Sequence, residues 1–522
     1  MIAPPPVTAQ GHHRALCPAV ILGVFILHVV MRFDVLILPP YWDSLHGVFV
    51  EAIWLKDNNF DYWRLIHDEP SFTYGGAAVY VWSIIPTIYA LLYVLLPSPH
   101  AVFLVLHLAS YLLVGSIAWL VYSIATKHLT LRPSTAALIS AAVVLQPTFT
   151  GQADALSMEI PVAAACLMLA REFLRQRYWH CCAWSFAALL IKDAAILICL
   201  VNLLLAVTGM LTGAGEKNVR RRMLIATGLP VLFRFLCVHY MSSQPLRIGT
   251  PMGFDTAQDL LMIWISNPEL YIAGAVCGFG VLALIRRSVD RDADWRTWIA
   301  SGLTNSSIAP LVYLIGIWTT FVVFDFVTAV ELIRYAVWYL AFVTLAFFGW
   351  LHVAGIQAKT TDRAIVVYLI FCIINIQGIA RPELTGKHAR TGSVLERSRE
   401  YVTELRSNVR TAAFLEQHAK GRPVIVSTPL DRALAMPELG YVSRRLFVFS
   451  ENTKGVTYTK IGYFGDLNEQ GLRAAWYWYR PSGYIAVIGT GLVPGTSAHI
   501  LYRDDANGAE SFVYKLVPTT DP

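Results

Sequence analysis

The sequence predicts a mainly α-helical, polytopic membrane protein of about 11 transmembrane helices with a small C-terminal α/β domain. Hydrophobic residues make up 56% of the 522 residues and only 15% are charged, whereas a soluble chain of this length is far more polar. Apolar segments recur along most of the chain, and a polar remainder begins near residue 381. The net charge of +6 comes from basic residues gathered in short loops, so it requires no nucleic-acid partner.

Apolar segments near the roughly 20 residues that a helix needs to cross a bilayer are expected to be the spans. We place them at 16–38, 101–123, 134–150, 156–172, 181–191, 194–211, 223–240, 271–285, 306–324, 335–352 and 364–380. The first lacks a small-residue cleavage site, so residues 1–15 are expected to be a cytoplasmic N-terminus before an uncleaved span. Basic residues fill alternate loops, which assigns those loops to the cytoplasm and the C-terminal segment to the outer face.

The apolar segment 76–96 is the exception to this alternation. It is long enough to span, but a span there would move every later basic loop to the outer face. We therefore expect it to be re-entrant or to lie in the outer interface, within a first outer loop at 39–100 that carries interfacial helices. A full span is the alternative.

The segment 381–522 has the mixed pattern of a small α/β domain on the outer face. A charged helical stretch at 393–420 precedes short strand-like runs at 423–428, 445–450, 483–489 and 511–517. The eight cysteines all lie in apolar segments and show no CxxC spacing, which predicts core residues rather than disulfides or metal ligands.

Two charged residues, Lys192 and Asp193, interrupt the apolar run 181–210. Each charge costs roughly 2.5–3.5 kcal/mol at the centre of a bilayer, so such residues usually face a cavity or an interface. A less costly arrangement breaks the run into two short helices with the charged pair at the turn, level with the lipid head groups. Both arrangements indicate a functional site.

Three acidic residues near the predicted outer face are candidates for chemistry. Asp43 follows the first span, where a carboxylate can meet both a lipid head group and a soluble acceptor, although it could instead cap a helix over 44–56. Asp154 and Glu159 lie at the entrance of the fourth span. Asp154 could cap that helix, and Glu159 could pair with a cation such as Lys192. The other acids of the first outer loop, Glu51 among them, are expected to be polar-face residues.

Several cations lie at the same predicted boundary. Lys192, Arg334 and Arg247 together would suit a phosphate group, since lysine and arginine form charge-assisted hydrogen bonds to phosphate oxygens. Arg334 could instead extend from its helix to the interface. Arg234, within the seventh span, is expected to pair with a polar neighbour.

Five segments of the chain resemble, in their order, membrane-embedded glycosyltransferases of the GT-C class. They are WDSLHGVFVEAIWL (42–55), the Tyr-Gly-Gly at 74–76 before an apolar helix, GQADALSMEIPVAAACLMLA (151–170), SFAALLIKDAAILI (185–198) and LIRYAVWYL (332–340). The branch most similar is that of protein O-mannosyltransferases and aminoarabinose transferases, over roughly residues 16–380.

The resemblance implies a role for several of these residues. Asp43 matches the catalytic carboxylate of the first outer loop, and Glu159 or, less well, Asp154 matches a second acid. Lys192 matches the lysine of a turn between two short helices. The pair Arg334–Tyr335 matches an Arg-Tyr pair that opens a late span.

The activity implied is transfer of a hexose or pentose from a polyprenyl-phosphate donor to an acceptor hydroxyl, with inversion of the anomeric carbon. The acceptor would be a glycan, lipid or protein at the outer face of a bacterial inner membrane, as in cell-envelope glycan assembly. No cofactor is implied with certainty; a divalent cation could bind if Asp43 and Glu159 converge.

Two departures from the family pattern leave other functions open. Ser44 follows Asp43 where the family often has a second acid, and Gly75–Gly76 replaces a Pro-Pro pair. Loss of the second acid makes a non-catalytic scaffold of the same fold one alternative. A lipid or sugar transporter or flippase is the other, because charges within apolar runs and broken helices also mark transport paths.

Overall fold

The computed structural model describes most of the helical segments and part of the C-terminal sheet. The described residues are 10–41, 44–62, 64, 83–213, 216–241, 268–289, 294–328, 337–376, 400–418, 424–426, 430–446, 448–450, 484–488, 498–504 and 511–516. Of the predicted site residues, Asp43, Arg247 and Arg334 lie outside these ranges, and so do Gly75 and Gly76.

Two compact units make up the chain. One, the helical unit, comprises Met1–Phe33, Ala78–Ile84 and Leu108–Ser398. The other, the loop-and-sheet unit, comprises Asp34–Ala77, Ile85–His107 and Arg399–Pro522. This division differs from the predicted boundary near residue 381, because most of the first outer loop is grouped with the C-terminal segment.

Helices occupy every apolar segment that was predicted to span. In chain order they are α1 (Gln10–Met31), α5 (Pro99–Lys127), α6 (Pro133–Val144), α7 (Pro147–Asp154), α8 (Glu159–Leu174), α9 (Tyr178–Ile191), α10 (Ile196–Thr212), α11 (Lys217–Met241), α13 (Pro268–Arg287), α14 (Trp295–Thr304), α15 (Ala309–Thr328), α16 (Val337–Val353) and α17 (Ala358–Ile376). The segment predicted at 134–150 is divided into α6 and α7 because Pro147 starts a new helix.

Two helices of the described chain are long and apolar enough to cross a membrane, Pro99–Lys127 and Asp193–Thr212. A third span results if the pair Arg296–Thr304 and Ala309–Val323, bent by 107°, counts as one. The chain is therefore an integral membrane protein, while the full number of 11 spans stays a prediction.

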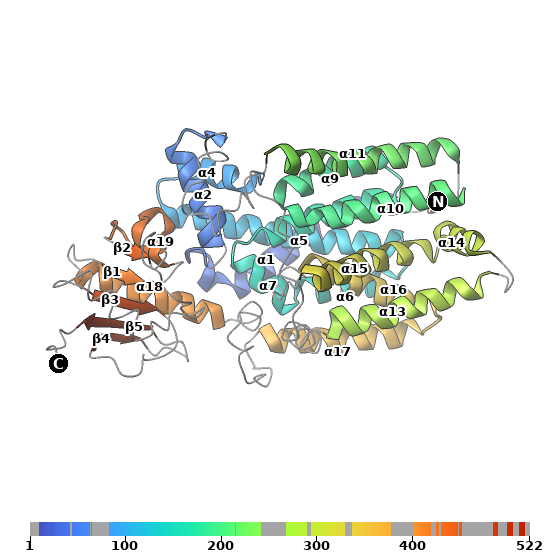
Figure 1. Ribbon diagram of the computed structural model, residues 1–522. Helices are drawn as coiled ribbons and strands as arrows, with labels where there is room; N and C mark the ends of the chain where they lie inside the picture. The colour runs from blue at the N-terminus through green and yellow to red at the C-terminus, as the bar shows by residue number, and fades with distance from the viewer. Residues whose placement is uncertain are drawn as a thin grey trace, which may run out of the picture. The chain divides into compact units, whose positions relative to one another are not determined.

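Helix α16 lies at the core of the helical unit. Nearly all of its side chains are buried, with Trp338 and Tyr339 each 1% exposed, as expected for a helix that is apolar all round. It packs against α13, α15 and α8, and the ring of Tyr339 stacks on Phe321 of α15 at 4.0 Å. Beside this core, α11 packs against both α9 and α10 (Figure 1).

The loop-and-sheet unit combines short helices with a mixed sheet. Its elements are the π-helical turn η2 (Ser44–Phe49), α2 (Val50–Asp57), α4 (Ile85–Leu95), α18 (Glu400–His418), β1 (Val424–Val426), α19 (Leu430–Ala435), β2 (Val448–Ser450), β3 (Tyr484–Ile488), β4 (Ala498–Asp504) and β5 (Ser511–Leu516). The strand order is β2-β1-β3-β5-β4 (Figure 1), with β1 parallel to both neighbours and β5 antiparallel to both of its own.

The four predicted strands are all present, and α18 lies within the predicted helical stretch. Strand β4 was missed. Its sequence, AHILYRD, has only a short apolar run, and it is paired along its length with β5.

The first outer loop and the C-terminal segment share one core within this unit. The Phe49 ring contacts those of Tyr89 and Phe103 at 4.8 and 5.9 Å. The hydroxyl of Tyr441 donates to the carbonyl of Pro40 at 2.8 Å, and that of Tyr93 donates to the carbonyl of Glu438 at 2.9 Å. Contacts between residues so distant in sequence explain why the two segments form one unit.

Helix α4 is the described part of the apolar segment 76–96. It has 11 residues, hence a length of about 16 Å at 1.5 Å per residue, which is short of the roughly 30 Å hydrocarbon core. Its interfacial or re-entrant placement stays a prediction, since residues 76–82 lie outside the described chain.

Candidate functional site

The apolar run around Lys192 is broken into two helices, as predicted. Helix α9 ends at Ile191, Lys192 has an extended backbone (φ −154°, ψ 135°), and a single 3-10 turn over Asp193–Ala195 leads into α10. The charged pair therefore lies at a helix break and not within a continuous helix.

The two charges of this turn pair with different helices. The ammonium of Lys192 forms an ion pair with Glu159, the first residue of α8, and the carboxylate of Asp193 pairs with Arg234 of α11. The Glu159 side chain is only 3% exposed and that of Lys192 13%. Both pairs confirm sequence predictions, and together they hold the turn between α8 and α11.

Glu159 is the first residue of α8. A carboxylate in the first turn of a helix is stabilised by the positive end of the helix dipole. Its Oε1 atom accepts the Lys192 bond, while its buried Oε2 atom has no hydrogen-bond partner among the described residues. The pair thus has one acceptor atom that the described protein leaves unused.

A segment just before α4 is bonded to the same turn. The hydroxyl of Ser83 donates to the carbonyl of Ile191 at 2.8 Å, and the backbone N–H of Ile84 donates to the carbonyl of Leu190 at 2.7 Å. The last carbonyls of a helix have no partner within the helix, so these two bonds satisfy the end of α9. They bring the middle of the predicted interfacial segment 76–96 next to Lys192.

Asp154 does not cap α8, so that alternative is wrong. It is the last residue of α7, whereas the residue before α8 is Met158, which makes no capping bond with its side chain. Asp154 instead forms a buried ion pair with Arg32 and accepts a hydrogen bond from the hydroxyl of Tyr111 at 2.8 Å.

Arg32 was missed by the sequence reasoning. It follows α1 directly and is 2% exposed, against 4% for Asp154. Two such charges are tolerated in an apolar setting because each compensates the other and further hydrogen bonds complete the pair. The signal in the sequence was a single arginine inside the first predicted span, 16–38.

Glu51 is the second missed residue, and its prediction as a polar-face residue is wrong. It is 1% exposed, and the neighbouring side chains of α2, among them Val50 and Ile53, are buried as well. Neither carboxyl oxygen has a hydrogen-bond partner among the described residues. Burial raises the pKa of Glu51 to about 8, so the carboxyl group is largely protonated at neutral pH.

Replacing Glu51 with Gln should flatten the pH dependence of stability. The folded-state pKa, about 8, exceeds the ordinary value of 4.5, so the folded chain holds a proton that the unfolded chain releases between these pH values. Wild-type stability then falls as pH rises through this range, by at most about 1.4 kcal/mol per pH unit. We expect the advantage of the Gln variant to grow from about pH 5 to about pH 8.

Thermal unfolding in detergent at several pH values measures this effect. Asp57→Asn on the same helix is the matched control, since the Asp57 side chain is 55% exposed. Parallel curves for wild type and Glu51→Gln would show that Glu51 is charged in the folded protein.

The described chain contains no group of three or more His, Cys, Asp or Glu side chains placed to hold a metal ion. The seven described cysteines are buried and free, as their positions in apolar segments predicted.

No protein-family model and no curated protein sequence matches the chain. Among solved structures, it is similar to ArnT from Cupriavidus metallidurans bound to undecaprenyl phosphate, with 13% identity, a TM-score of 0.48 and coverage of 97% of this chain and 98% of that one. The apo state of that ArnT gives 15% identity and a TM-score of 0.40, covering 94% of this chain and 98% of that one.

A third similar structure is the arabinofuranosyltransferase AftD from Mycobacteria. It gives 12% identity and a TM-score of 0.42, covering 82% of this chain and 30% of AftD.

Proposed function

We propose that the chain is a glycosyltransferase that moves a sugar from a polyprenyl-phosphate donor to an acceptor hydroxyl at the outer face of the membrane. The observation that carries the proposal is the charged turn, where a partly buried ammonium lies at a break between two apolar helices. A lipid phosphate that leaves during the reaction needs such a cation at the membrane boundary, because negative charge develops on it.

Asp43 is assigned as the general base. In a single displacement, the acceptor oxygen attacks the anomeric carbon, the bond from that carbon to the phosphate oxygen breaks, and Asp43 takes the acceptor's proton. The configuration at the anomeric carbon is inverted, and polyprenyl phosphate leaves. A positioned carboxylate contributes typically about 10²–10⁴-fold to such a step.

Lys192, Arg247 and Arg334 are assigned to the donor phosphate. Their ammonium and guanidinium groups form charge-assisted hydrogen bonds with phosphate oxygens. Glu159 positions Lys192 through the ion pair described above. Asp154 positions Arg32 in the same way, through its own ion pair. If a divalent cation takes part, the carboxylate oxygens of Asp43 and Glu159 would be its ligands.

A transporter or flippase for lipids or sugars is the second candidate. Charged residues at a helix break also occur along transport paths. The discriminating observation is covalent change in the donor, because transport leaves the lipid-linked sugar intact whereas transfer converts it to polyprenyl phosphate.

The lipid pool of the native membrane tests the proposal without a prior choice of sugar. Cells that lack the chain, or that carry only an Asp43→Asn variant, should accumulate one polyprenyl-phosphate sugar, which mass spectrometry of the lipid extract identifies. Wild-type cells should keep that lipid low. A donor pool identical in all three strains would contradict the proposed transfer.

The C-terminal segment is proposed to lie outside the cytoplasm of a bacterial inner membrane. A reporter that is active only in the cytoplasm should therefore stay silent when fused after Pro522. The same reporter fused to a chain truncated at Glu216, in a loop assigned to the cytoplasm, should be active. An active C-terminal fusion would show that the topology, including the interfacial placement of 76–96, is wrong.

A further inference from the structure

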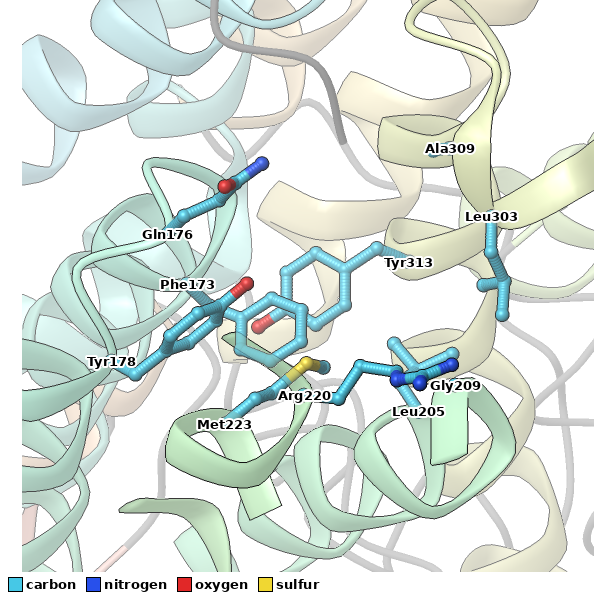
Figure 2. A pocket seen from close by; sticks show the side chains of 10 residues that line it. All are labelled: Phe173, Gln176, Tyr178, Leu205, Gly209, Arg220, Met223, Leu303, Ala309 and Tyr313. Carbon is cyan, nitrogen blue, oxygen red and sulfur yellow. The ribbon is translucent and has the colours of Figure 1, made fainter. Parts of the chain in front are cut away.

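A hollow lies at the opposite end of α9 from the charged turn. Its cavity volume is about 50 Å³, it is partly open to solvent, and its lining comes from α8, α9, α10, α11, α14 and α15 and from the turn between α8 and α9. Figure 2 shows the rings of Phe173, Tyr178 and Tyr313 gathered on one side and the guanidinium of Arg220 on the other. Leu205 and Met223 add apolar side chains to the lining, and Gln176 adds a polar one.

Arg220 is the charged group of this hollow. Its Nε and Nη1 atoms are buried and have no hydrogen-bond partner among the described residues. An ideal Cβ on Gly213, the left-handed residue that ends α10, would lie 3.4 Å from Nη1, so the guanidinium is beside the end of that helix. The partial negative charge of a helix end compensates a full positive charge only in part. The guanidinium therefore has N–H groups that could donate hydrogen bonds to an anion.

The surroundings of Arg220 are also positive. Arg220 lies in the first turn of α11, which contains no acidic residue, and the positive end of a helix dipole adds to its charge. Lys217, Arg221 and Arg222 are exposed beside it. Glu216 is the nearest acid in the sequence and is exposed. An anion at this position would be favoured by these cations and by the positive end of α11 together.

An apolar surface adjoins the hollow. On α10, Leu204 and Leu211 are 63% and 67% exposed, and they flank in sequence the lining residues Leu205 and Gly209. On α11, Ile225 is 43% exposed, one turn beyond Arg220. In a membrane protein such side chains face acyl chains, so one molecule could place an anionic group at Arg220 and its chains along these helices.

We propose that the Arg220 pocket binds the phosphate head group of an anionic phospholipid. The guanidinium and the positive end of α11 bind the phosphate, and the aromatic and aliphatic lining receives the glycerol and upper acyl region. The predicted topology assigns this end of the helices to the cytoplasmic leaflet. The proposed lipid site is distinct from the predicted donor site at Lys192 and does not depend on glycosyl transfer.

Binding of defined lipids to the full-length protein in detergent tests the proposal, with native mass spectrometry counting bound lipids. Wild type should bind phosphatidylglycerol at least about tenfold more tightly than phosphatidylcholine, and Arg220→Gln should lose about tenfold in affinity for phosphatidylglycerol. Arg221→Gln, which removes an exposed neighbouring charge, should bind as wild type does.

A second variant keeps Arg220 and blocks the space. A Cβ on Gly209 would meet nothing within 4 Å, so Gly209→Leu can extend into the hollow without disturbing its own helix. Gly209→Leu should lose phosphatidylglycerol binding. This test remains valid if the Arg220→Gln variant fails to fold. Unchanged binding in Gly209→Leu, or equal binding of both lipids to wild type, would overturn the proposal. If inorganic phosphate alone saturated the pocket and phosphatidylglycerol then had no further effect, the ligand would be a soluble phosphate. That result would overturn the proposed lipid site.

Discussion

Replacing Asp43 with Asn should reduce sugar transfer by at least about 10²-fold while the protein stays folded in the membrane. The amide has nearly the same size as the carboxylate and still accepts a hydrogen bond, so a helix cap at this position would lose about 1 kcal/mol or less. An amide cannot take the proton of an acceptor hydroxyl. Initial rates with the purified variant and a lipid-linked sugar, together with a thermal unfolding curve, measure both properties.

Asp57→Asn is the control for this experiment. Asp57 belongs to the same first outer loop, its side chain is 55% exposed, and its carboxylate lies 3.2 Å from the ammonium of the neighbouring Lys56. The control variant should transfer sugar as wild type does. Near wild-type rates for Asp43→Asn would mean that Asp43 only caps the helix, and the general-base assignment would be abandoned.

Replacing Lys192 with Met should lower both stability and transfer. Met keeps much of the apolar stem, but the carboxylate of Glu159, which is 3% exposed, loses the cation paired with it. Removing one partner of a buried ion pair typically costs about 3–5 kcal/mol, because an uncompensated charge remains. A loss of activity in this single variant therefore does not separate a donor-binding role from a structural one.

The double variant Lys192→Met/Glu159→Gln separates the two roles. It removes both charges of the pair, so most of the lost stability should return. Transfer should stay at least about tenfold below wild type, since the donor phosphate still lacks its ammonium, and the KM for the donor should rise. If stability and transfer recover together, Lys192 serves only as the counter-ion of Glu159.

The helix break at Lys192 could be predicted because the cost of charge in an apolar run is a local property of the sequence. The partners of that turn were also accessible, since Glu159 and Arg234 are isolated charges in apolar surroundings that need compensation. Strand-like runs predicted β1, β2, β3 and β5 for a similar reason, because each has an apolar, β-branched or aromatic pattern of its own.

Features that depend on contacts between distant segments could not be predicted in this way. Arg32 pairs with Asp154 across 122 positions, and nothing near either residue selects the other. Glu51 has the sequence context of a polar-face residue, yet it is buried in the loop-and-sheet unit, where α2 packs against α4. The union of the first loop with the C-terminal segment likewise depends on contacts such as that between Tyr441 and Pro40.

Conversion of the accumulated donor by purified protein tests the central claim most directly. The polyprenyl-phosphate sugar isolated from cells that lack the chain would be incubated in detergent with wild type or Asp43→Asn and with an acceptor extract from the same cells. Detergent removes the two compartments, so transport cannot imitate the reaction. The proposed mechanism predicts that wild type releases one polyprenyl phosphate for each sugar transferred and that Asp43→Asn releases almost none. Intact donor after incubation with folded wild-type protein, or equal conversion by both proteins, would contradict it.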